Sequence, residues 1–249
     1  MEKQLPSLMN DSIIEEYMAM LFDNGKHEEY NDTKELLKYI ENLEKQFDTV
    51  VKELHDIKEQ LNTMQNPTVK MRVVSAVDKT HTVINNSMNK LNDIKTEITT
   101  SMKASLNSFK QKGKTGVVKT INLLHIKEAL KGMRKSFFIA MNKSKQLSYT
   151  VDAMTLEMRN VKRNLKNVGL LFVGKEVNNK NIDKQKVNNV QKSARLITRT
   201  LESMVIKSTK MVDRLENMEK KSVKNELKLL CESSDTKKIN RNKNKEQLR

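Results

Sequence analysis

The chain has 249 residues, of which 31% are charged and 37% are hydrophobic, and its formal net charge is +16. Six Gly, two Pro, no Trp and 4% aromatic residues leave little material for tight turns, sheets or a thick globular core. This composition excludes a compact β-rich domain. Its apolar residues recur too regularly for a disordered protein, so we expect an elongated all-α fold.

The charge is unevenly distributed along the chain. Residues 1–66 carry 7 basic and 15 acidic side chains, a net charge of −8, whereas residues 67–249 carry 40 and 16, a net charge of +24. A basic surface for nucleic acid or anionic lipid is one interpretation, and packing of the acidic part on the basic part is the other. We divide the chain into an acidic helical segment (1–66), a basic bundle of long helices (67–231) and a disordered basic tail (232–249).

The first two expected helices are each preceded by a capping pattern. Ser12 and Glu15 have the spacing of a capping box and open a short amphipathic helix that ends near Asn24 and Gly25. Asp32, followed three residues later by a Glu, opens the second helix, which reaches about residue 65. The seam of this helix alternates spacings of four and three, as in a coiled coil, and includes Leu36, Ile40, Leu43, Phe47, Leu54 and Leu61.

A third helix is expected from about residue 68 to 112, after Pro67 at a first helical position. Its seam is weaker, because Thr80, Ser87 and Ser101 stand where apolar residues are expected. Residues 113–116, Gly-Lys-Thr-Gly, then interrupt the helical pattern.

The longest regular pattern is an unbroken heptad repeat from Leu123 to Phe172. Such a repeat predicts a helix that packs against a partner along its whole length. Its candidate packing residues are Leu130, Phe137, Leu147, Val151, Met154, Met158, Leu165 and Phe172. We therefore expect Lys at either Met154 or Leu165 to unfold the protein, because each substitution would bury an unpaired charge.

A polar stretch over residues 174–186 predicts a linker, and a last helix is expected from about residue 187. Its seam includes Ile197, Leu201 and Leu215. Basic residues lie beside the seam of the helix from Leu123 to Phe172, and their repulsion disfavours a parallel homodimer of that helix. The second helix carries Glu residues beside its seam and so offers the opposite charge. The charges thus favour an intramolecular antiparallel bundle.

The stretch from residue 103 to 145 holds eleven basic residues and one acid, which makes it the candidate contact for an anionic partner. Its candidate residues are Lys127, Lys131, Arg134, Lys135, Lys143 and Lys145. Nucleic acid would bind there without sequence preference, and an anionic membrane would bind a basic amphipathic helix. A solvated helix face is the third interpretation.

No motif points to catalysis. Gly113-Lys114-Thr115 lacks the earlier Gly and the strand of a phosphate-binding loop, and the four His residues have no metal-ligand spacing with one another or with Cys231, the single cysteine. We expect a non-enzyme with no cofactor, no metal and no small-molecule substrate. One cysteine and the polar start of the chain predict a cytoplasmic protein, with membrane association as an alternative.

Four segments carry a resemblance to a known family. Tyr39–Val50, Glu53–Leu61 and Val168–Lys175 resemble an uncharacterised family of helical proteins in Clostridia and related bacteria. Lys221–Lys228 is similar to a segment near the ends of accessory proteins of integrative conjugative elements, with Lys221 in place of the typical Pro. The resemblance implies a domain of unknown function on a mobile element, and it supplies no activity and no site residues.

From these observations we expect a helical binding or scaffolding protein, with a protein partner or self-association through its helices. The alternatives are a sequence-independent nucleic-acid binder linked to DNA transfer and a peripheral protein on anionic membranes.

Overall fold

The computed structural model describes residues 8–62, 67–112, 123–177 and 188–246, with side chains described as far as Lys220 in the last range. Its elements are η1 (Leu8–Asn10), α1 (Ser12–Asp23), α2 (His27–Asn62), α3 (Pro67–Lys112), α4 (Leu123–Phe172) and α5 (Asn189–Glu246). The described residues contain helices and no strands, which confirms the expected all-α fold.

The starts of the first two helices differ from the sequence prediction. Asp11, one residue before Ser12, caps α1, and its carboxylate accepts a 2.8 Å hydrogen bond from the Ile13 N–H. Helix α2 begins at His27, two residues after Gly25, whose φ of 70° suits a tight helix-to-helix turn. Asp32 therefore lies inside α2, where its carboxylate is available for a bond to another helix.

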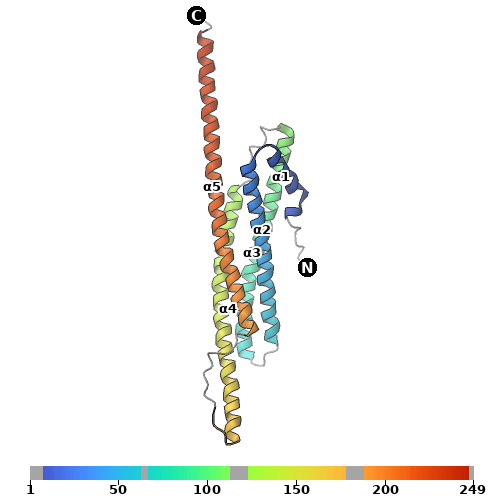
Figure 1. The fold of residues 1–249 in the computed structure, drawn as a ribbon, viewed down its shortest axis with the longest axis vertical. Helices are drawn as coiled ribbons and strands as arrows, with labels where there is room; N and C mark the ends of the chain where they lie inside the picture. The colour runs from blue at the N-terminus through green and yellow to red at the C-terminus, as the bar shows by residue number, and fades with distance from the viewer. Residues whose placement is uncertain (1–7, 63–66, 113–122, 178–187, 247–249) are drawn as a thin grey trace.

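Helices α2, α3, α4 and α5 form an antiparallel four-helix bundle in an up-down-up-down order (Figure 1). Each helix packs against the next, and α5 closes the ring by packing against α2, while α1 covers α2 and α3. The intramolecular antiparallel arrangement expected from the charges is the one observed. The boundary proposed at residue 66 falls between two helices of this one bundle.

The seams of the four helices meet in a continuous core. Phe47 of α2 and Phe137 of α4 face each other across the bundle, with ring centroids 5.6 Å apart. The buried candidate seam residues are Leu36, Ile40, Leu43, Phe47, Leu54, Leu61, Leu130, Phe137, Leu147, Val151, Met154, Ile197, Leu201 and Leu215.

Ion pairs join the acidic α2 to its basic neighbours. Lys95 of α3 is buried, and its ammonium lies 2.5 Å from the Glu44 carboxylate. Arg214 of α5 donates to Asp32 at 2.8 Å and also contacts Glu35. In the bundle, therefore, acidic side chains of the first quarter pack against basic side chains of the remainder.

The helices of the bundle end at different levels. The C-terminal end of α4 extends beyond the other helices at one end of the bundle, and the C-terminal end of α5 extends beyond them at the other end (Figure 1). The tail from residue 232, which the sequence predicts to be disordered, falls on this extension, and α5 continues through it as far as Glu246. An isolated helix gains nothing from tertiary packing, and this stretch has few apolar residues to bury.

Candidate binding surface at the end of α4

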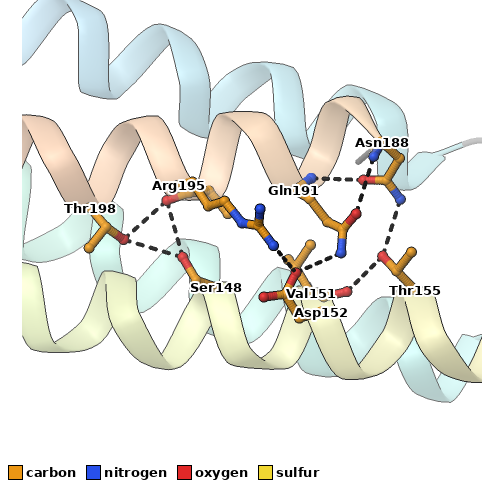
Figure 2. A network of polar contacts seen from close by, with 9 residues as sticks. Ser148, Val151, Asp152, Thr155, Asn188, Gln191, Arg195 and Thr198 are labelled. Atoms are coloured by element: carbon orange, nitrogen blue, oxygen red, sulfur yellow. Dashed lines mark hydrogen bonds and ion pairs between the residues drawn. The ribbon is translucent and has the colours of Figure 1, made fainter. Parts of the chain in front are cut away.

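A polar network between α4 and α5 marks where the bundle ends (Figure 2). Asn188 and Gln191 form a reciprocal cap at the start of α5. The Gln191 N–H donates to Asn188 Oδ1 at 2.8 Å, and the Asn188 N–H donates to Gln191 Oε1 at 3.1 Å. Asn188 Nδ2 also donates to Thr155 Oγ1 at 3.1 Å, which fixes the first turn of α5 beside Thr155 of α4.

The same network extends into the bundle. Gln191 Nε2 donates to Asp152 Oδ1 at 2.6 Å, and Arg195 lies 3.4 Å from the same oxygen (Figure 2). Ser148 Oγ donates to the Ala194 carbonyl at 3.2 Å. These contacts hold α5 on α4 in one register and leave the part of α4 after Thr155 without α5 beside it.

Beyond Thr155 the apolar seam of α4 continues, but it is no longer buried. Met154 is 4% exposed, whereas Val161 is 59%, Leu165 69% and Phe172 88% exposed. We call residues 156–172 the α4 overhang, which is about 25 Å long at 1.5 Å per residue.

The structure corrects the packing predicted for Met158, Leu165 and Phe172. All three side chains are exposed, because the described neighbouring helices do not reach them. Since a large exposed apolar surface commonly marks an interaction site, the overhang is the candidate binding surface.

The exposed seam of the overhang is narrow and has two different borders. At 100° per residue, Met158, Val161, Leu165, Val168 and Phe172 fall on one stripe about 80° wide. Lys162 and Lys166 lie along one side of this stripe, and Asn160 and Asn164 lie along the other. At the end of the helix the exposed Val173 and Leu171 follow on these two sides. A narrow seam of this kind is typical of helix pairing.

A hollow of about 560 Å³ lies between α3 and α4 at the base of the overhang. Met71, Arg72, Met154 and Glu157 contribute to its lining. Because Met71 is 68% exposed, apolar surface continues from the overhang onto the start of α3.

One comparison with known proteins gives a match. Residues 10–248 match the family of unknown function DUF6674. The chain belongs to this family. No curated protein and no solved structure matches it. Membership in DUF6674 thus establishes an uncharacterised helical family and assigns no activity.

In this DUF6674 chain, three of the six basic candidates take part in the packing of α4 on α5. Lys127 is buried and pairs with Glu219, so the structure corrects its placement on an accessible surface. Lys131 pairs with Glu216 at 3.0 Å, and Lys145 pairs with Glu202 at 3.1 Å.

Hydrogen bonding between Lys131 and Glu216 raises the pKa of the ammonium and lowers the pKa of the carboxyl group. The other three candidates, Arg134, Lys135 and Lys143, lie at the surface or are half-buried, and none of them forms an ion pair with a described residue. The structure therefore divides the basic stretch between an internal interface and the solvent.

Two features of the bundle are absent from the sequence prediction. The cap at Asn188 and Gln191 has the spacing of a capping box, and this signal in the sequence could have placed the start of α5. Lys95 stands next to Ile94 of the seam, and no sequence signal separates it from the exposed lysines.

The described residues contain no cluster of three or more His, Cys, Asp or Glu side chains that could hold a metal ion. Within the same part of the chain, no helix combines the length and the apolar character needed to cross a membrane.

Proposed function

We propose that the protein is a non-enzymatic helical binding or scaffolding protein whose bundle presents the α4 overhang to a partner. One observation carries this proposal: the seam that is buried at Val151 and Met154 continues, exposed, through Leu165 to Phe172. The exposure of five apolar side chains to water is unfavourable in free energy, and burial of these side chains by a partner would remove that cost.

The biological context we propose is that of an accessory protein of a conjugative mobile element. The similarity of Lys221–Lys228 to a segment of such accessory proteins supports this context. A cytoplasmic location is part of the proposal and follows from the same context.

Sequence-independent binding of nucleic acid remains the second candidate function. Arg134, Lys135 and Lys143 support it, because they form no ion pair with the described residues. The engagement of Lys127, Lys131 and Lys145 by α5 reduces the number of cations available for phosphates.

The test is site-specific photo-crosslinking in cells that produce the protein. A photoreactive residue at Leu165 lies on the exposed seam, and one at Arg163 lies on the opposite face of the same helix. The proposal predicts a discrete adduct from position 165 that is suppressed by Val168→Lys and is absent from position 163. Equal labelling from both positions, or none from position 165, would refute the overhang as a binding surface.

A further inference from the structure

The packing of α4 on α5 shows which kind of helix α4 binds. An apolar seam forms the centre of the contact, and basic residues of α4 form ion pairs along its border. Lys127 pairs with Glu219 and Lys131 with Glu216, so the residue numbers rise on one helix as they fall on the other. The partner of α4 in the bundle is therefore an antiparallel amphipathic helix with Glu beside its seam.

The overhang repeats this basic border. Lys162 and Lys166 follow Lys127 and Lys131 by 35 residues, which is five heptads. In a heptad repeat, residues separated by whole heptads keep the same position relative to the seam. Lys162 and Lys166 are exposed and form no ion pair with any residue that the structure describes. The overhang thus has the seam and the cations of the α5-binding face but lacks the helix.

The sequence before α5 does not supply the matching helix. The pairs of Lys131 with Glu216 and of Lys145 with Glu202 fix the register of α5 on α4. If α5 were extended backwards in this register, Gln185 would lie opposite Lys162. The same register would place Asn181 opposite Lys166, and neither of these residues is acidic. The corresponding seam positions, Lys180 and Asp183, are charged.

The charges also disfavour a second copy of the overhang as its partner. Residues 156–177 carry five basic and two acidic side chains, so two overhangs would repel each other. An interfacial helix on lipid has a broad apolar face along its length, whereas the overhang carries Lys along one border of its seam and Asn along the other, and its apolar surface broadens at the end, where Leu171 and Val173 are exposed.

We infer that the α4 overhang binds an antiparallel amphipathic helix of another protein, and that this helix carries Glu or Asp opposite Lys162 and Lys166. The inference rests on the proposed function, because it specifies the partner of the same surface. Charge complementarity and the internal precedent of α5 determine the chemistry of that partner.

A synthetic peptide serves as the probe. Residues 201–224 of this chain contain the α5 seam together with Glu216 and Glu219, so the peptide presents the helix that α4 already binds. Fluorescence anisotropy of the labelled peptide with the full-length protein measures binding. We expect saturable binding that weakens as salt rises, because ion pairs contribute to it.

The decisive variants reverse charges. Lys162→Glu with Lys166→Glu should weaken binding roughly tenfold, because two attractive pairs become repulsive. A peptide with Glu216→Lys and Glu219→Lys should restore the affinity for this variant. Arg163→Glu is the matched control on the opposite face and should change the affinity less than about twofold, since its charge is distant from the seam.

Two results separate the inference from the proposed function. If Leu165→Lys abolishes peptide binding while the charge reversals act no differently from Arg163→Glu, the surface stands and the acidic partner is refuted. If Leu165→Lys leaves peptide binding unchanged, the peptide binds elsewhere and the inference fails, whereas the proposed function fails only if photo-crosslinking from position 165 gives no discrete adduct. Overhang-dependent binding to phosphatidylserine vesicles, or a doubled mass that Leu165→Lys abolishes, would also overturn the inference, in favour of a lipid or a second copy.

Discussion

The Lys95–Glu44 pair provides the most sensitive test of how the bundle is held together. The Lys95 side chain is 2% exposed and the Glu44 side chain is 29% exposed, so the ammonium has little contact with water and lies against this carboxylate. Removing one partner of a buried pair costs about 3–5 kcal/mol, because the remaining charge is left in a poorly solvated site. Glu44→Gln keeps the shape of the side chain, and we expect a loss of about 3 kcal/mol, since water can reach the half-buried Glu44.

The opposite substitution should cost far less. Lys95→Met replaces the buried ammonium with an apolar side chain of similar length and leaves Glu44 partly hydrated, so we expect a change below about 1 kcal/mol or a gain in stability. Urea unfolding followed by circular dichroism at 222 nm measures both variants and the double variant, which should resemble Lys95→Met alone. If Glu44→Gln costs less than about 0.5 kcal/mol, as an ordinary surface substitution does, then Lys95 does not depend on Glu44.

Three further predictions test the cap, an interhelical ion pair and the core. Asn188→Ala should lower the free energy of unfolding by about 1–2 kcal/mol, because it removes an N-cap, whereas Asn189→Ala beside it should change stability by less than about 0.5 kcal/mol; an equal effect of the two would contradict the cap. By carboxyl NMR, Glu216 should titrate below the usual Glu pKa of about 4.3, so its contribution to stability should be full above that value and lost as the pH falls through the lower folded-state pKa. Lys131→Met should raise the midpoint of the Glu216 titration. An unchanged midpoint would exclude the Lys131–Glu216 pair as the cause of the lowered pKa. Phe137→Ala should cost about 3–5 kcal/mol in urea unfolding, and a cost below about 1 kcal/mol would show that its ring does not fill the core.

The heptad pattern predicts which face of each helix is apolar, but it does not predict where packing ends. Met154 and Met158 belong to the same seam, yet one is buried and the other is exposed. The difference arises from the level at which α5 begins, which is set by the bond between Asn188 and Thr155. A repeat within one helix contains no information about the length of its neighbours, so the overhang is visible only in the structure.

The net charges of the two parts of the chain indicate which parts pack together, but they do not predict the individual ion pairs. The excess of acid in the first quarter predicts packing against the basic remainder, and Arg214 with Asp32 and Lys95 with Glu44 are examples of it. Lys127, by contrast, is a basic residue of the candidate partner surface that is buried within the bundle. Which lysines face inward depends on small offsets in helix rotation that composition does not encode.

The central claim is that the seam of α4 changes from core to surface along a single helix. The same substitution at two positions tests it most directly: Leu147→Lys, where the side chain is 0% exposed, and Leu165→Lys, where it is 69% exposed. In thermal and urea unfolding of the purified protein, we expect Leu147→Lys to cost about 3 kcal/mol or more and Leu165→Lys to remain within about 0.5 kcal/mol of the unmodified chain. Similar, large losses at both positions would show that the seam is packed along its whole length and would contradict the account.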